Sequence, residues 1–396
     1  MKIEYFIPNK FLSLKYNTNL NKNFKKIKNL NPNKNQNPFS FFNKNFKFEF
    51  TGSEIRSYKK FKNVVIVGMG GSVLGAKAIL GFLRHKIKKN FVFLENLDSQ
   101  LLEKLYERDL KKTLFLVISK SGNTLETLVN LNFLIQKKIN FKNIVIISEK
   151  SENILFKFSK KNKIKHIAHK KFIGGRFSVL SEVGMLPAEL MGLNIKKIRL
   201  NLNKFFKNTH AKILKKNVIK LSKFYKSNKF KTIILMNYHP GLTDFLFWYQ
   251  QLAAESLGKK GLGLLPVVSQ APKDHHSLMQ LYLDGPTDKI FYIFSSNKKT
   301  RFTVKNNLLS KEINFIKNKN LSEIVNAQKN AFMKILRKKK LPYRHFKINN
   351  NNEKTLGELL SYFMIETALL GLSLNINPFN QPAVEEIKIE TKKGLS

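Results

Sequence analysis

The segment SKSGNTLETL at residues 119–128 concentrates hydrogen-bond donors in a few positions. It follows the apolar run 114–119 and precedes a helical pattern, so the free N–H groups of the first helical turn face the same point. Many short donors converging on one point suit a phosphomonoester dianion. The alternative is an ordinary helix cap completed by Glu126. The donors are the hydroxyls of Ser119, Ser121 and Thr124 and the ammonium of Lys120.

A glycine cluster, VVIVGMGGSVLGAKAI at residues 64–79, also joins an apolar run to a helical pattern. Such a turn presents backbone N–H groups to an anion. The dinucleotide fingerprint requires glycine where Val73 stands, and a P-loop requires lysine where Ala76 stands, so both nucleotide motifs fail by one position. The cluster predicts either a general anion site with the Ser72 hydroxyl or only a tight turn. Because open α/β sheets bind ligands beyond the strand carboxyl ends, the two loops reinforce each other.

Two further segments carry groups suited to charge and proton transfer. Arg176 stands in GGRFSVLS, where a buried guanidinium needs an anionic partner, either a substrate oxyanion or an acidic side chain of the protein. Gln251 and Glu255 lie one turn apart in an apolar helical pattern, so they project together. Glu255 is therefore a candidate proton-shuttling base. The alternative is an ordinary surface pair between Glu255 and Lys259.

Two adjacent histidines, His275 and His276, follow the apolar run 264–270 and a turn. A histidine at a strand exit is a candidate acid–base group, although a solvent-facing or core-bridging histidine is the commoner case. We predict no metal site, because His166 and His169 form only a weak pair of ligands. Lys388 is one of many lysines, and its chemistry alone does not select it.

These residues must be positioned by short apolar strands that alternate with helices, which predicts two α/β domains with parallel sheets covered on both faces. The predicted strands are 64–68, 91–96, 114–119, 144–148, 232–237, 264–270, 290–296 and 346–349, and the predicted helices are 72–83, 126–135, 244–258, 322–340 and 356–372. The expected division is an N-terminal extension (1–50), a first domain with the phosphate loops (51–195), a second domain (196–372) and a C-terminal arm (373–396). Residues 17–46, rich in Asn and Lys, are expected to be poorly structured or to wrap around the domains.

The composition of the 396 residues excludes several classes of protein. With 42% hydrophobic residues the chain can bury a core, and with no cysteine it has neither disulfides nor thiolate chemistry. The net charge of +46 comes from 72 Lys and Arg against 26 Asp and Glu. Only eight of the 72 basic residues are arginine, the residue best suited to phosphate, so a drift towards A/T-rich codons is favoured over a dedicated polyanion-binding surface. The apolar stretch 64–83 contains Lys77 and several glycines, and the N-terminus lacks a secretory pattern, so we expect a cytoplasmic protein.

Six segments, taken together and in order, resemble the glucose-6-phosphate isomerase family, whose fold is of the sugar-isomerase (SIS) type. They span the chain from Val64 to Lys388, and GGRFSVLS and ESLGKKG are the most specific. The segments are GMGGSVLG, SKSGNTLET, GGRFSVLSEVGMLP, WYQQLAAESLGKKG, KDHHSLMQLYLDGP and NPFNQPAVEEIK. The resemblance implies two α-β-α sandwich domains with mostly parallel sheets, flanked by the N-terminal extension and the C-terminal arm.

The resemblance implies reversible conversion of glucose 6-phosphate into fructose 6-phosphate through a cis-enediolate, in glycolysis and gluconeogenesis, without a metal or organic cofactor. By residue-to-residue match, Glu255 would move a proton between C2 and C1, and Arg176 would stabilise the enediolate. His276 would open the sugar ring with help from Lys388. The phosphate would be held by Ser72, Ser119, Lys120, Ser121 and Thr124, and the sugar would be lined by Gly71, Gln251 and Gln381.

In that family the ring-opening histidine comes from the neighbouring subunit, so a homodimer with a shared site is implied, without a specific nucleic acid or membrane partner. His275 stands where glutamine is usual and Asn123 where threonine is common, and these departures leave open an enzyme that also isomerises mannose 6-phosphate. The alternative of another class is a non-catalytic regulator that binds sugar phosphates. The presence of Glu255, His276 and Lys388, without a recognisable helix-turn-helix segment, argues against the regulator.

Overall fold

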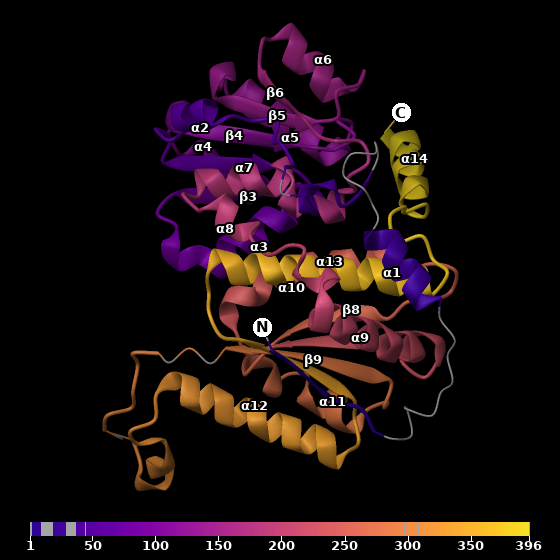
Figure 1. Ribbon diagram of the computed structural model, residues 1–396. Coiled ribbons are helices and arrows are strands. Elements are labelled where there is room, and N and C mark those ends of the chain that lie inside the picture. Colours follow the sequence, from indigo (N-terminus) through magenta and orange to yellow (C-terminus); the bar gives the residue numbers. More distant parts are fainter. Residues whose placement is uncertain are drawn as a thin grey trace.

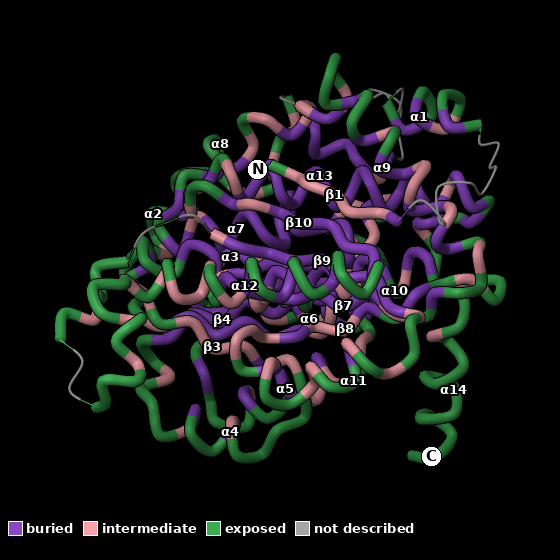
Figure 2. Tube along the Cα trace, turned by 90° about the horizontal axis from the view of Figure 1, so that it is seen from below, coloured by how far each residue is buried: buried purple, intermediate pink, exposed green. Residues whose placement is uncertain are grey.

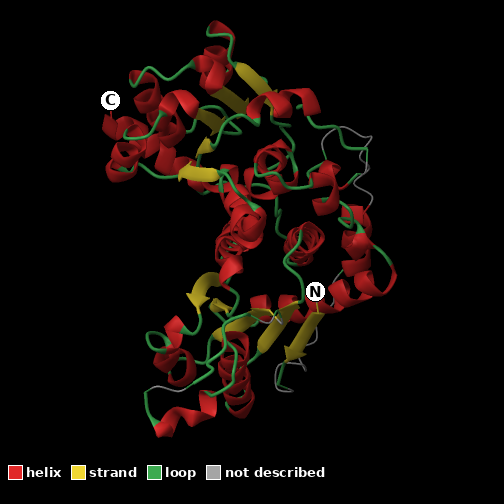
Figure 3. Cartoon of the chain, turned by 90° about the vertical axis from the view of Figure 1, so that its left-hand side faces the viewer, coloured by secondary structure: helices red, strands yellow, loops and turns green. Residues whose placement is uncertain are grey.

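The computed structural model of the protein describes residues 2–8, 19–28, 37–43, 45–296, 298, 300–306 and 309–395. Two five-stranded sheets lie on either side of a central layer of helices (Figures 1 and 3). The first sheet contains β2 (Asn63–Val67), β3 (Asn90–Leu94), β4 (Thr113–Ile118), β5 (Ile144–Ser148) and β6 (Lys165–Ala168). The second contains β1 (Lys2–Phe6), β7 (Thr232–Asn237), β8 (Leu265–Gln270), β9 (Lys289–Ser296) and β10 (Tyr343–Ile348).

Helices cover both faces of each sheet. Those between residues 52 and 198 are α2 (Gly52–Tyr58), α3 (Leu74–Leu83), α4 (Ser99–Tyr106), α5 (Leu125–Gln136), α6 (Ile154–Lys161), α7 (Glu182–Leu190) and α8 (Ile195–Ile198). The others are α1 (Leu20–Lys28), α9 (Asn208–Lys226), α10 (Thr243–Leu257), α11 (Met279–Asp284), α12 (Leu321–Lys338), α13 (Glu353–Ser373) and α14 (Val384–Leu395). Short 3₁₀ turns that enter the argument are η2 (Ser40–Phe42), η3 (Gly70–Ser72), η7 (Gly175–Leu180), η8 (Lys204–Phe206) and η10 (Lys273–His275).

The first sheet is parallel throughout and is buried on both faces, as its apolar strands predict. Alternate residues of a strand point to opposite faces, so Val64 and Ile66 of β2 pack with α2 and α7. Val65 and Val67 pack with α4, α5 and α6 on the other face. The stretch 64–83, apolar enough to suggest a membrane span, is confirmed as a strand, a turn and a helix.

The two sheets repeat one strand order. The first is β3-β2-β4-β5-β6 and the second is β1-β10-β9-β7-β8. In each sheet, the first strand of the repeat (β2 or β7) lies between the second (β3 or β8) and the third (β4 or β9). The fourth strand (β5 or β10) pairs with the third. The expected α/β class with two mostly parallel sheets is thus confirmed. The exception to parallel pairing is β1, which runs antiparallel to β10 at the edge of the second sheet.

A buried ion pair ties β10 to the central helix α13. Arg344 donates to both carboxylate oxygens of Glu366, from Nη1 at 2.9 Å and from Nη2 at 2.6 Å, and both side chains are 2% exposed. Nη2 also donates to the Tyr362 hydroxyl at 2.8 Å, and Asn217 of α9 donates to the same hydroxyl at 2.8 Å. The ring of Tyr5 on β1 lies 5.3 Å from the guanidinium. One charged pair therefore connects β1, β10, α9 and α13.

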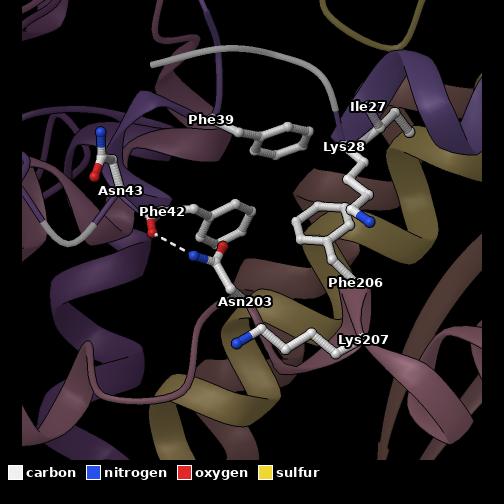
Figure 4. Close-up of a pocket in the computed structure, with 8 residues that line it drawn as sticks. All are labelled: Ile27, Lys28, Phe39, Phe42, Asn43, Asn203, Phe206 and Lys207. Atoms are coloured by element: carbon white, nitrogen blue, oxygen red, sulfur yellow. Dashed lines mark hydrogen bonds between the residues drawn. The ribbon is translucent and has the colours of Figure 1, made fainter. Parts of the chain in front are cut away.

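The described parts of the N-terminal extension lie against the body of the protein. β1 belongs to the second sheet, and α1 packs on α13. Residues 17–46 were expected to be poorly structured or to wrap around the domains. Of these, residues 17–18, 29–36 and 44 lie outside the described residues. Between α1, η2 and η8 there is a hollow of about 340 Å³ (Figure 4). Its lining residues are Ile27, Lys28, Phe39, Phe42, Asn43, Asn203, Phe206 and Lys207, with Asn203 donating to the Phe42 carbonyl at 3.0 Å.

The last two helices differ completely in burial. Among the described residues, α13 alone has the length and apolar composition of a membrane-crossing helix, and 89% of its most apolar stretch is buried. It packs against α1, α8, α9 and α10 as the central helix of the core. α14, by contrast, has no buried residue and projects from the body (Figures 1 and 2). Its apolar residues Ile387, Ile389 and Leu395 are 72%, 55% and 73% exposed.

Because two histidines are buried, we expect the free energy of unfolding to fall in mild acid. Burial lowers the pKa of His169 and of His345 to about 4, so both stay neutral in the fold while the unfolded chain binds protons near pH 6.5. Between these values the unfolded state holds more protons, so the free energy of unfolding decreases as the pH falls. Each histidine contributes up to about 1.4 kcal/mol per pH unit.

We therefore expect the urea midpoint to drop between pH 7 and pH 5, and to drop less in His345→Asn. Burial raises the pKa of Glu4, but its contacts with Lys2, Lys347 and His345 lower it to about 2 overall. The stability that Glu4 contributes is therefore lost only below about pH 4.5 and does not affect this window. An equal midpoint at pH 7 and pH 5 would contradict the prediction.

Candidate active site

The predicted phosphate loops meet at the point where the strand order of the first sheet reverses. β2 pairs with β4 in parallel, with Val67 opposite Val117, so their carboxyl ends adjoin. The chain leaves β2 for β3 on one side and later returns to β4 on the other. Ligands of open α/β sheets bind in the crevice that this reversal leaves. Residues 70–72, after β2, and residues 119–124, after β4, both stand at that crevice.

Within the second loop the hydroxyl groups already contact one another. The Oγ of Ser119 lies 2.8 Å from the Oγ1 of Thr124, and it accepts from the N–H of Gly122 at 3.2 Å. Thr124 directly precedes the first residue of α5, so the free N–H groups of that helix face the loop. Burial lowers the pKa of Lys120, although an ion pair with Glu149 at 3.7 Å opposes this effect. The loop thus combines hydroxyls, a helix start and a cation.

Two contacts hold this loop against the start of α6. Gly122 has a φ of +67°, and a Cβ added there would lie 1.8 Å from Oδ1 of Asn153. Asn123, one of the departures from the family pattern, accepts from the N–H of Ile154 through Oδ1 at 3.0 Å. The asparagine therefore has a structural role at the base of the loop. Ser121 accepts from the N–H of Asn123 at 3.3 Å.

The backbone of η7 touches the glycine turn after β2. A Cβ added to Gly71 would lie 2.3 Å from the carbonyl carbon of Gly175 and 2.6 Å from the N of Arg176. Only glycine permits this approach, which explains the pairing of GMGGS with GGRFS across a long sequence distance. The hydroxyl of Ser178 also donates to the carbonyl of Gly175 at 2.7 Å. The contact delivers Arg176 to the edge of the phosphate crevice.

Arg176 uses all five of its N–H donors within the chain. Its side chain is 1% exposed. Burial lowers the pKa of Arg176, and the charge of Glu255 counteracts this. Nε donates to Ser256 Oγ at 2.8 Å. Nη1 donates to Glu255 Oε2 at 3.2 Å and to Gln381 Oε1 at 2.6 Å. Nη2 donates to the carbonyl of Pro378 at 2.6 Å and to that of Asn380 at 2.9 Å.

Glu255 is held from two sides and remains open on a third. Gln251, one turn earlier on α10, donates from Nε2 to Glu255 Oε1 at 2.8 Å, as their helical spacing predicts. Arg176 donates to the other oxygen. The Glu255 side chain is 26% exposed and lines a groove of about 750 Å³, whose lining also includes Asn380 and Gln381. The alternative of a surface pair with Lys259 is wrong, because Lys259 donates to backbone carbonyls instead.

Ten predicted residues are thus brought to adjoining loops and one groove, whereas two are not. His276 is exposed, and its side chain has no hydrogen bond or ion pair with the described residues. Lys388 on α14 is paired only with Glu385, at 2.6 Å, among those residues. His275 faces inward, where Nε2 lies 2.5 Å from the Tyr238 hydroxyl and the ring packs on Phe332. Of the two adjacent histidines, His276 is therefore the one available to a ligand. The residues brought together are Gly71, Ser72, Ser119, Lys120, Ser121, Thr124, Arg176, Gln251, Glu255 and Gln381.

Several residues at the site escaped sequence reasoning. Ser256 and Lys259 belong to the motif ESLGKKG, but nothing in their spacing reveals that Ser256 binds Arg176 or that Lys259 binds the 377–380 backbone. Phe39 of the N-terminal extension packs against Phe177 at 5.7 Å and Phe379 at 5.8 Å between ring centroids. It thus supports both the residue after Arg176 and the loop before Gln381. The described residues hold no cluster of three or more potential metal ligands.

The comparisons with known proteins agree on one family. The sequence profile of phosphoglucose isomerase matches residues 41–393. The glucose-6-phosphate isomerase of Methanocaldococcus jannaschii is 36% identical over 349 residues, covering 84% of this chain and 84% of that protein. The glucose-6-phosphate isomerase of Mycoplasmopsis synoviae is 35% identical over 352 residues, covering 83% and 81%.

Solved structures share the fold. A hypothetical protein from Thermus thermophilus superposes with a TM-score of 0.84 at 24% identity, covering 95% of this chain and 94% of that chain. A glucose-6-phosphate isomerase from Chlamydia trachomatis superposes with a TM-score of 0.73 at 21% identity, covering 87% of this chain and 71% of that chain. The two-sheet architecture described above is therefore common to these proteins.

Proposed function

The chain belongs to the phosphoglucose isomerase family, and from this membership we propose how its residues interconvert glucose 6-phosphate and fructose 6-phosphate, the reaction expected of the family. The observation that carries the proposal is the Glu255 carboxylate, fixed by Gln251 and Arg176 at the wall of an open groove. A carboxylate held in place in this way can remove a proton from a sugar carbon and return it to the neighbouring carbon.

In this proposal the phosphate binds at the crevice after β2 and β4, which holds the substrate by a part that does not react. Its ligands are Ser72, Ser119, Lys120, Ser121 and Thr124. Binding energy from the phosphate then fixes the sugar carbons beside Glu255. Gly71 would leave room for the sugar, with Gln251 and Gln381 along it.

Proton transfer then proceeds between Glu255 and two carbons of the open-chain sugar. Glu255 takes the proton from C2 of the aldose, and the electrons move to O1 to form the enediolate. The Nη1 group of Arg176, which already donates to Glu255, stabilises that negative charge. The proton of the C2 hydroxyl moves to O1, Glu255 returns its own proton to C1, and C2 becomes the carbonyl carbon of the ketose. The opposite order gives the reverse reaction.

The test is turnover of fructose 6-phosphate in D₂O, followed by NMR. We expect glucose 6-phosphate to form with deuterium at C2, because a carboxylate that holds the proton between carbons exchanges part of it with solvent. Conversion without any deuterium would contradict the enediolate route, and absence of conversion would favour the non-catalytic regulator. Mannose 6-phosphate in a parallel reaction tests the broader substrate range.

We also propose that the enzyme is a cytoplasmic homodimer in which His276 opens the ring in the partner's site, with Lys388 assisting. Two observations support the shared site: the side chain of His276 is exposed and makes no hydrogen bond or ion pair with Glu255 or another described residue, and α14 leaves three large apolar side chains uncovered. An uncovered apolar face of this kind is typical of an interaction surface.

Mixing two inactive variants tests the shared site. Glu255→Gln and His276→Asn should each be inactive as homodimers. After co-refolding, half of the dimers are mixed, and each mixed dimer holds one intact site, so about a quarter of wild-type activity should return. The control is co-refolded Glu255→Gln with itself. If the mixture stays inactive although mass spectrometry detects mixed dimers, His276 acts within its own chain or not at all.

A further inference from the structure

The segment 377–381 is held in place by two cations from different parts of the chain. Arg176 of η7 donates from Nη2 to the carbonyls of Pro378 at 2.6 Å and Asn380 at 2.9 Å. Lys259, just beyond α10, donates from Nζ to the carbonyls of Asn377 and Asn380, each at 2.6 Å. The Asn380 carbonyl therefore accepts from both cations. The next residue, Gln381, places its side-chain oxygen on Nη1 of Arg176.

Lys259 begins a tight turn that two backbone hydrogen bonds close. Its backbone N–H and carbonyl pair with those of Leu262, each at 3.0 Å, and close a tight turn. Lys260 and Gly261 form that turn with φ angles of 54° and 68°. The third contact of the ammonium is the Ser256 carbonyl, at 3.4 Å. Burial and the nearby charge of Arg176 lower the pKa of Lys259 to about 8, so the fold keeps this ammonium beside a guanidinium at an electrostatic cost.

The donors of Arg176 divide into two groups. Nε and Nη2 contact Ser256 and two backbone carbonyls, all of them parts of the protein that anchor the guanidinium plane. Nη1 contacts Glu255 and the side chain of Gln381, both of which line the groove. A shift of 377–381 would remove both acceptors of Nη2 and would rotate the plane that presents Nη1.

We infer that Lys259 is a positioning residue for the isomerisation: by holding the 377–381 segment, it keeps Gln381 and the guanidinium of Arg176 oriented toward Glu255. The inference rests on the proposed roles of Glu255 and Arg176. Lys259 acts through the loop and does not touch the reacting carbons. A small displacement of an oriented group lowers the reaction rate strongly, because the activation barrier depends on the geometry at the reacting atoms.

The first test compares kinetic constants of Lys259→Gln with those of the wild type. We expect kcat to fall by about 10- to 100-fold, because the orientation of Arg176 is lost. KM should change by less than about threefold, because the phosphate loop at 119–124 is a separate anchor. Lys259→Arg, which can still donate to the carbonyls, should recover most of kcat. The matched control is Lys260→Gln, whose ammonium reaches only the Asn375 carbonyl at 3.4 Å among the described residues.

The second test does not depend on activity. Hydrogen exchange of the backbone amides at 377–383 should speed up about tenfold in Lys259→Gln and remain unchanged in Lys260→Gln. Unchanged exchange, or a kcat within twofold of wild type, would overturn the inference even if the isomerase reaction is established. Conversely, a wild type that does not turn over would refute the proposed function, while the exchange result would still decide whether Lys259 holds the loop. If Lys259→Gln does not fold, Lys259→Met takes its place in both measurements.

Discussion

Glu255→Gln should lower kcat for fructose 6-phosphate by about 10²- to 10⁴-fold, the range typical of losing a general base. Glutamine keeps the size and shape of the side chain, and its amide oxygen can still accept from Gln251 or Arg176. What it cannot do is bind and release the proton that moves between C2 and C1. KM should change little, because the phosphate is held elsewhere. A coupled assay that oxidises glucose 6-phosphate with NADP⁺ measures the rate.

The control for this variant is Glu390→Gln, which removes an exposed carboxylate paired with Lys393 at 2.7 Å on α14. Its kcat should equal that of the wild type, and thermal unfolding of both variants should match the wild type within a few degrees. A Glu255→Gln enzyme within threefold of wild-type kcat would remove Glu255 from the mechanism. The hypothesis of a non-catalytic regulator would then be supported only if the wild type were also inactive.

Glu366→Gln should destabilise the second sheet by about 3–5 kcal/mol, because it leaves the Arg344 guanidinium charged and buried without its counter-ion. The same change removes the carboxylate acceptor of the Tyr362 hydroxyl. Because β1, β10, α9 and α13 all meet at this pair, the loss should appear as early unfolding of that whole region. Urea unfolding followed by circular dichroism, with hydrogen exchange to locate the region, measures the effect.

Two further variants separate a buried charge from a general loss of packing. Arg344→Met/Glu366→Leu replaces both charges with apolar groups of similar volume and should be more stable than Glu366→Gln alone. Glu385→Gln breaks an exposed pair and should change the free energy of unfolding by less than about 1 kcal/mol. If Glu366→Gln were as stable as Glu385→Gln, the buried pair would not be a stabilising feature of this fold.

Much of the fold could be predicted from the sequence, because strands that are buried on both faces are apolar at every position. The run VVIV and the run LFLVI are predicted for this reason, and both lie in the middle of the first sheet. β6 and β1 were missed, since KHIA and KIEYF are short and partly polar. Their pairing depends on partners elsewhere in the chain, which local patterns do not reveal.

The site was predictable as a set of residue types but not as a network. The one-turn spacing of Gln251 and Glu255 predicts their contact, because helix geometry sets it locally. The five acceptors of Arg176 come from distant segments, and three of the contacts involve backbone carbonyls or a serine that carry no signal in the sequence. For the same reason the sequence leaves open a surface pair of Lys259 with Glu255, whereas tertiary packing directs Lys259 to the backbone carbonyls of 377–380.

The pairing of β1 with β10 has a consequence for biosynthesis. Lys2 lies opposite Lys347, so β1 leaves the ribosome long before β10, the strand with which it pairs. The first sheet, in contrast, is built from one continuous stretch and can form while translation continues. Contacts between such distant residues form slowly. A nascent chain that is halted before β10 should therefore hold a folded first sheet and an unpaired β1, which a chaperone or protease could reach.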